Sequence, residues 1–142
     1  MTDPGKCVLC ISDISKTYRT EKLSVPVLYD IDLKVNNGEF VSIMGPSGCG
    51  KSTLMNLIGC LDRPSGGSIV LNGNDISSLS DAKLAEIRNK YIGFVFQTFN
   101  LLPRVTAVEN VEIPLVYSGV ERKERRKKAL EALDSMGVLK RA

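Results

Sequence analysis

The sequence contains no histidine and only four cysteines, at positions 7, 10, 49 and 60. Cys7 and Cys10 have the spacing of half a zinc-binding pattern, but no second cysteine pair and no histidine is present to complete it. On a β-strand, residues three apart point to opposite faces. We therefore interpret Cys7 and Cys10 as small apolar side chains in a reduced cytosol, and we predict no cysteine-bound metal.

Long apolar runs are also missing. No stretch approaches the length needed to span a bilayer, and the first six residues lack the apolar core of a signal peptide. The 142 residues are 43% hydrophobic and 25% charged, which suits one folded domain with a core of its own. We expect a cytoplasmic protein, unless a partner holds it at a membrane.

The excess of positive charge is small, with a net charge of +3, and it is concentrated in residues 121–128. This run has six basic and two acidic side chains. Glu121 and Arg125, like Glu124 and Lys128, are four residues apart, as in ion pairs on an exposed helix face. The run has no interleaved aromatic residues and no reading motif. The sequence therefore predicts a solvated helix here and no nucleic-acid partner.

The most specific pattern present is Gly-Pro-Ser-Gly-Cys-Gly-Lys-Ser at residues 45–52, which matches the phosphate-binding loop (P-loop) GxxxxGK[ST]. Its glycines permit a backbone whose N–H groups converge on a phosphate, at the positive end of the helix that follows. Lys51 would reach the terminal phosphates, and the Ser52 hydroxyl would bind Mg²⁺. The alternative is a glycine-rich turn that fits the pattern by chance; the strand and helix predicted around it disfavour that interpretation.

The predicted nucleotide site therefore contains Gly45, Pro46, Ser47, Gly48, Cys49, Gly50, Lys51, Ser52 and Thr53. A helix amino terminus favours the thiolate form of a cysteine. We therefore expect alkylation of Cys49 to block nucleotide binding, and bound ATP to protect it.

The order of predicted elements indicates an α/β fold. Strands are predicted at 7–18, 27–35, 40–44, 68–73 and 91–96, with a flexible polar connection at 19–26 and a hairpin turn at 36–38. Helices are predicted at 52–58 and at 81–89, the second with Leu84 and Ile87 inward. A short helix is predicted to follow a capping box at 106–109. A last helix is predicted at 121–136, with Leu130, Leu133 and Met136 on one side. Gln97 follows a buried strand, and ligands gather at the carboxyl ends of such strands.

Several of these segments together resemble the ATP-binding domain of ABC transporters, in particular the branch that serves lipoprotein-release and macrolide-export permeases. The resemblance rests on Tyr18, the P-loop, and segments 58–67, 93–103 and 106–110. It implies an incomplete P-loop NTPase core with an antiparallel β subdomain within residues 1–97, and the start of an α-helical subdomain at 98–142.

The resemblance also implies roles and partners. The aromatic ring of Tyr18 would stack on adenine. Gln97 would bind Mg²⁺ or the attacking water, so that Ser52 and Gln97 are the expected metal ligands. ATP and Mg²⁺ are the implied cofactors. The implied partners are a transmembrane permease subunit and a second ATP-binding subunit, which would place the protein at the inner face of the cell membrane.

Some of the family's pattern is not found in these 142 residues. There is no Leu-Ser-Gly-Gly-Gln signature segment, no apolar strand that ends in Asp-Glu, and no switch histidine. In related folds the Asp-Glu strand pairs beside the P-loop strand, so we expect 40–44 to expose an apolar edge. We therefore predict weak ATP binding, negligible turnover and poor solubility, as for an amino-terminal portion from a truncated or split gene.

Two other interpretations stay open. The chain could be a non-catalytic module, or a gene remnant, that binds nucleotide or the permease without hydrolysis. It could also be a small P-loop kinase, although no acceptor-binding segment is evident and the context of Gln97 argues against that class.

Overall fold

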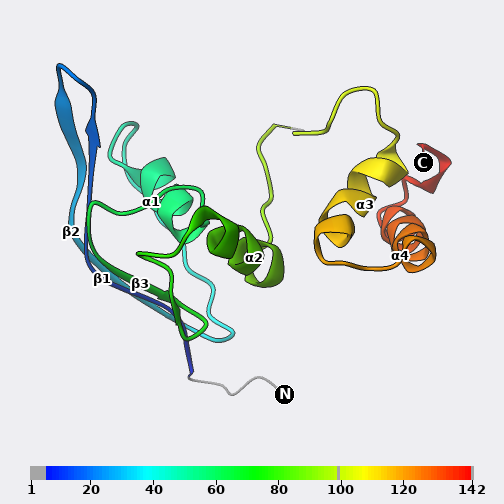
Figure 1. The fold of residues 1–142 in the computed structure, drawn as a ribbon, viewed down its shortest axis with the longest axis horizontal. Helices are drawn as coiled ribbons and strands as arrows, with labels where there is room; N and C mark the ends of the chain where they lie inside the picture. Colours follow the sequence, from blue (N-terminus) through cyan, green and yellow to red (C-terminus); the bar gives the residue numbers. More distant parts are fainter. Residues whose placement is uncertain (1–5, 99, 142) are drawn as a thin grey trace. The chain divides into compact units, whose positions relative to one another are not determined.

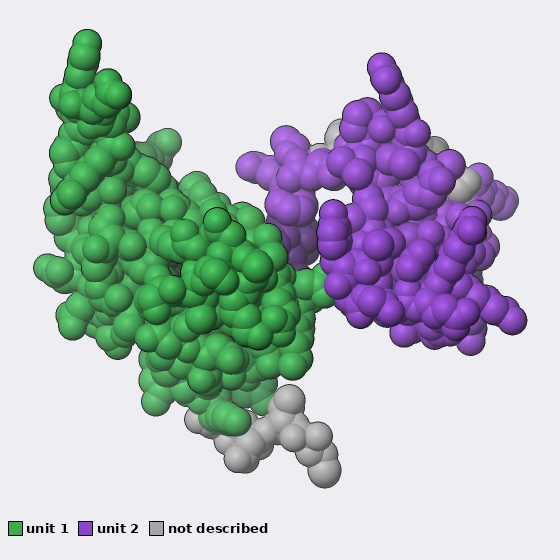
Figure 2. Space-filling model, in the orientation of Figure 1, with its two compact units in different colours: residues 1–92 green, residues 93–142 purple. Residues whose placement is uncertain are grey.

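The computed structural model describes residues 6–98 and 100–141. The chain forms two compact units, Met1–Ile92 and Gly93–Ala142 (Figure 2). The first contains a β-sheet with two helices, and the second contains a helical hairpin.

An antiparallel sheet is the framework of the first unit, as predicted. It consists of β1 (Cys7–Arg19), β2 (Ser24–Asn36), β3 (Gly66–Leu71) and β4 (Asn74–Asp75), in the spatial order β2-β1-β3-β4. A tight turn joins the two long strands, and in it the Thr20 amide donates to the Leu23 carbonyl at 2.8 Å. The connection is therefore shorter than the predicted 19–26, because both strands extend into that range and leave only residues 20–23 between them.

Two helices lie against one face of this sheet, namely α1 (Lys51–Ile58) and α2 (Asp81–Tyr91) (Figure 1). The core that they share with the sheet contains Leu9, Ile11, Ile14, Leu28, Leu54, Leu57, Cys60, Ile69, Ile76, Leu84 and Ile87. The inward positions predicted for Leu84 and Ile87 are confirmed. The Ser80 hydroxyl accepts a hydrogen bond from the Lys83 amide and so caps α2.

Two predicted strands do not form. Residues 40–44 are an extended loop, and 92–96 follow the end of α2 without strand pairing. Phe40 is 95% exposed and Val95 fully exposed. An apolar run becomes a strand only when a neighbour takes up its backbone hydrogen bonds, and a parallel strand must be covered on both faces. Neither run has such a neighbour in the described residues. The apolar exposure expected for 40–44 is therefore confirmed, whereas the strand and the hairpin predicted there do not form.

A helical hairpin makes up the second unit. It consists of α3 (Ala107–Tyr117) and α4 (Arg122–Ser135), followed by the short 3-10 turn η1 (Leu139–Arg141). Val108, Ala129 and Leu133 form its small core. The predicted capping box is confirmed: the Thr106 hydroxyl accepts from the Glu109 amide, and the Glu109 carboxylate accepts from the Thr106 amide at 2.7 Å.

Two details of α4 differ from the sequence prediction. Met136 lies past the end of the helix and is 77% exposed, so it does not share the inner side with Leu133. Glu124 and Lys128 form the predicted ion pair, with 3.6 Å between carboxylate and ammonium. Glu121 instead occupies the N-cap position, while the Arg125 guanidinium donates to the Val120 carbonyl at 2.8 Å.

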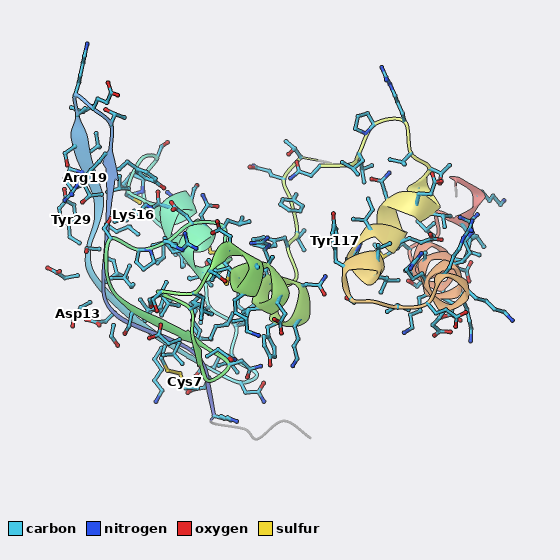
Figure 3. All side chains as sticks on the ribbon, viewed as in Figure 1. Cys7, Asp13, Lys16, Arg19, Tyr29 and Tyr117 are labelled. Atoms are coloured by element: carbon cyan, nitrogen blue, oxygen red, sulfur yellow. A yellow bond between two sulfur atoms is a disulfide. The ribbon has the colours of Figure 1, made fainter. Side chains whose placement is uncertain are left out.

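The prediction that Cys7 and Cys10 are independent apolar side chains is also wrong, because the two form a disulfide within β1 (Figure 3). The pairing register of β1 with β2 shifts between Cys7 and Leu9. Such an irregularity interrupts the strict alternation of faces, so that side chains three residues apart can share a side.

No helix in the described part of the chain is long and apolar enough to cross a membrane.

Candidate functional site

The P-loop forms a turn that leads directly into α1. Gly48 and Gly50 adopt φ values of +81° and +93°, which side chains with a Cβ rarely take. Gly50 is the N-cap of α1, and no side chain caps the helix there. The amides of the first helical turn have no partner within the helix and are left free for a ligand.

Close packing also requires glycine at two positions in this loop. A Cβ on residue 50 would lie 2.7 Å from Leu28 Cδ2 and 3.2 Å from the Val27 carbonyl, both on β2. A Cβ on residue 45 would lie 2.9 Å from Cys49 Sγ. The lack of a side chain at residues 45 and 50 therefore allows the loop to fold back toward Cys49 and to pack against β2.

The side chain of Lys51 folds back and forms hydrogen bonds with the loop that precedes it. Its ammonium donates to the carbonyl oxygens of Gly45 and Pro46 at 2.9 and 2.6 Å, and lies 3.6 Å from Cys49 Sγ. A positive charge is thus held at the mouth of the loop, beside the positive end of α1. There is no acidic residue in the first turn of α1 to oppose an incoming anion.

The donors gathered here fit a phosphate group. An ammonium, free helix amides and the hydroxyls of Ser52 and Thr53 are the groups that bind phosphate at helix amino termini. The described residues contain no cluster of three or more carboxylate, cysteine or histidine side chains that could hold a metal by themselves.

Tyr18 lies near the carboxyl end of β1, opposite Val25 of β2. Its hydroxyl donates to Asp62 Oδ2 at 2.9 Å, and its side chain is 42% exposed overall. Lys16 pairs with Leu28, the residue that packs against Gly50. Tyr18 is therefore two positions along β1 from the part of the sheet that the P-loop touches.

A buried lysine, which the sequence analysis missed, lies next to Tyr18. Lys16 is only 8% exposed, and its ammonium is 2.6 Å from Asp62 Oδ1, 2.7 Å from the Arg63 carbonyl and 4.7 Å from the centre of the Tyr18 ring. A signal for it was available. Lys16 alternates with Ile14 on the inward side of β1, and a charge at a core position requires a partner.

The Asp62 carboxylate is held in its charged form by these neighbours. Partial burial raises its pKa, but hydrogen bonds from Lys16, from the Arg63 amide and from Tyr18 outweigh burial and leave the pKa lowered overall. A pocket of about 340 Å³ lies beside Asp62 and Arg63 rather than at the P-loop. The P-loop itself is an open surface loop, whose residues from Gly45 to Cys49 are exposed.

Gln97 belongs to the second unit, whereas the P-loop and Tyr18 belong to the first. Gln97 is exposed, in an irregular segment after the unpaired apolar run at 92–96. Its predicted role as a ligand of Mg²⁺ therefore stays a prediction. Phe99, within the segment that carried the family resemblance, lies outside the described residues.

Comparison with solved structures and curated sequences gives a consistent result. The dimeric bacterial ABC transporter cassette MJ0796, in a post-hydrolysis state bound to ADP and Pi, matches with a TM-score of 0.80 and 46% identity, over 89% of this chain and 56% of that one. An ABC transporter ATP-binding protein of Bacillus subtilis, YvrO, is 57% identical over 131 residues. The macrolide export ATP-binding/permease protein MacB of Marinobacter nauticus is 52% identical over 128 residues.

These matches cover nearly all of this chain but only part of the relatives. The chain spans 57% of the length of YvrO and 20% of MacB, against 92% and 90% of its own. The fold is that of an ABC cassette in incomplete form, an antiparallel sheet with four helices. The family model for ABC transporters matches residues 28–142, and on this evidence the chain belongs to the ABC transporter family.

Proposed function

We propose that this chain binds ATP together with Mg²⁺ through its P-loop, as the ATP-binding component of an ABC-type membrane transporter. The observation that carries the proposal is the arrangement at Lys51. A cation, a free helix amino terminus and a glycine-rich turn converge at one point, and no acidic side chain in the first helical turn opposes a phosphate there.

Each residue of the site has a separate task in this proposal. The ammonium of Lys51 exchanges the Gly45 and Pro46 carbonyls for oxygens of the terminal phosphates. The loop amides of residues 45–50 and the amides at the start of α1 surround the phosphates. Ser52 and Gln97 are the proposed protein ligands of Mg²⁺, which supplies charge neutralisation at the phosphates when bound. Tyr18 offers its ring to the adenine base.

We further propose that these 142 residues bind ATP without cleaving it. Phosphoryl transfer depends on groups that orient water and stabilise developing charge. The chain has no histidine and no apolar segment that ends in Asp-Glu. The alternative, a module that only binds nucleotide or a permease, predicts the same lack of turnover. Mixing with a separately expressed carboxyl-terminal portion of a relative separates the two, because only a split enzyme regains ATPase activity.

The proposed partners are a transmembrane permease and a second ATP-binding subunit, and the proposed location is the inner face of the cell membrane. The resemblance to MacB, whose name joins an ATP-binding part to a permease, supports the first partner. The dimeric state of the MJ0796 cassette supports the second.

The test of ATP binding is an equilibrium titration of the purified chain with ATP and Mg²⁺. Lys51→Ala should weaken binding by at least about tenfold, since a charged hydrogen bond to a phosphate is worth about 1.5–3 kcal/mol. Lys83→Ala is the matched control, because Lys83 is an exposed lysine of the same unit that forms an ion pair with Glu86 on α2. Equal affinity of the Lys51 variant and the control would refute the proposed role of the P-loop.

A further inference from the structure

We propose that Lys16 and Asp62 are positioning residues for the nucleotide base, because together they fix the ring of Tyr18 with one face covered and the other open. This inference rests on the proposed function, since it concerns the same nucleotide site. It adds two residues outside the P-loop to that site and assigns them an effect on base recognition rather than on phosphate binding.

The first step of the argument is the way in which the Tyr18 ring is held. Asp62 accepts hydrogen bonds from two directions, from the Lys16 ammonium at 2.6 Å on Oδ1 and from the Tyr18 hydroxyl at 2.9 Å on Oδ2. The carboxylate therefore fixes the far end of the ring. The Lys16 ammonium is 4.7 Å from the ring centre, within the range of a cation–π contact. A tyrosine held at both its hydroxyl and one face has little rotational freedom left.

The second step is the rigidity of the segment that carries Asp62. The Thr17 amide donates to the Ser65 hydroxyl at 2.9 Å, which ties this loop to β1. On the other side, the Arg63 guanidinium donates to Asp81 at 2.7 Å and to the Leu79 carbonyl at 2.8 Å. Asp62 is thus anchored between β1 and the start of α2, so it can serve as a fixed point for the ring.

The third step concerns the open face. Tyr18 keeps 42% of its surface exposed although its hydroxyl and one face are engaged, whereas Lys16, whose ammonium lies over the ring, is buried. A flat, aromatic, neutral group can stack on such a face. A ring that is already ordered loses less conformational entropy when a base binds. The arrangement therefore favours one-sided stacking of a purine base at the end of β1.

A merely structural role is the competing explanation, because Lys16 and Asp62 also join β1 to the loop after α1. The two roles differ in what they do to ligands that lack a base. A loss of structure would weaken the binding of any triphosphate, whereas a misplaced ring would weaken only the binding of a ligand with a base.

The experiment compares the affinities of ATP–Mg²⁺ and tripolyphosphate–Mg²⁺ for the full 142-residue chain and for Lys16→Met, Asp62→Asn and Tyr18→Phe. We expect each variant to lose about three- to tenfold in affinity for ATP, a part of the value of base–aromatic stacking, with tripolyphosphate affinity changed by less than about twofold. Tyr18→Phe keeps the ring and deletes only its hydrogen bond to Asp62. It therefore tests the positioning of the ring even where a change at Lys16 unfolds the chain. Lys83→Met is the control for removal of an ammonium group.

The outcomes separate this inference from the proposed function. If the native chain binds both ligands and the variants change the two affinities in the same proportion, or change neither, Lys16 and Asp62 do not position the base. If the native chain binds tripolyphosphate as tightly as ATP, no base is stacked and the inference falls while the P-loop proposal stands. Failure of the native chain to bind either ligand would refute the proposed function, and the inference with it.

Discussion

Lys51 shows how a single side chain prepares the P-loop before any ligand is present. Its ammonium satisfies its donors on the loop's own carbonyls, so the charge is already at the place where the proposed phosphates bind. Binding then exchanges partners instead of ordering a free lysine, which reduces the loss of side-chain entropy. The same contacts oppose binding slightly, because the carbonyl bonds of Gly45 and Pro46 must first be released.

Cys49 offers a chemical probe of this loop. The thiol is free and exposed, and it lies 3.6 Å from the Lys51 ammonium. We predict that ATP with Mg²⁺ slows the alkylation of Cys49 several-fold, because bound phosphates would cover the mouth of the loop. The measurement is the rate of labelling by a small maleimide, followed by mass spectrometry.

Cys60 provides the internal reference for that measurement. It is the other free cysteine in the described residues and is buried in the core of the same unit, so its labelling reports unfolding. A Cys49 labelling rate that is the same with and without ATP–Mg²⁺, at unchanged Cys60 labelling, would contradict nucleotide binding at the P-loop.

Among the elements, α3 depends on the capping box at its amino terminus. Thr106 and Glu109 bond reciprocally across the first turn, and the helix has only Val108 fully buried against α4. We predict that Thr106→Ala lowers the free energy of opening this turn by about 1 kcal/mol, the usual value of an N-cap. Amide hydrogen exchange at residues 109–111 measures that free energy directly.

The matched control for α3 is Ser135→Ala, which deletes a hydroxyl at the last residue of α4. That hydroxyl donates to the Ala132 carbonyl of its own helix. Its removal should change amide exchange in the first turn of α3 by less than about 0.3 kcal/mol. Equal effects of the two variants would show that the capping box does not stabilise α3.

The elements also show what could be predicted from the sequence. The helices and the capping box were predictable because their signals are local: apolar residues three and four apart, and a cap of matched side chains. The absence of the strands predicted at 40–44 and 91–96 could not be foreseen, since an apolar run has the composition of a strand whether or not a neighbour pairs with it. The Cys7–Cys10 disulfide was missed for a related reason, because it depends on a register shift that only the pairing of β1 and β2 creates.

For the whole molecule, the division into two units separates the predicted site residues. The P-loop, Tyr18 and the Lys16–Asp62 pair lie in the first unit, and Gln97 lies in the second. The sequence predicted the P-loop because its pattern is contiguous. It could not predict Lys16 and Asp62 as a pair, because they are 46 residues apart and meet only when the loop after α1 folds back on β1.

Exposed apolar side chains are the other feature at this scale. Phe40 and Met44 in the first unit, and Val95 and Phe96 in the second, all expose half or more of their surface. Apolar surface of this kind favours association with other chains. The poor solubility expected from the sequence stays a prediction, and binding measurements need a check of the oligomeric state.

The most direct test of the account is to recover the nucleotide from the protein itself. The chain is brought to equilibrium with ATP and Mg²⁺ across a dialysis membrane, and the nucleotide bound to the chain and the released phosphate are then quantified. We predict that intact ATP is recovered from the native chain, with much less from Lys51→Ala and no phosphate release above the rate in buffer. Absence of bound nucleotide, or steady release of phosphate that Lys51→Ala abolishes, would contradict a chain that binds ATP without cleaving it.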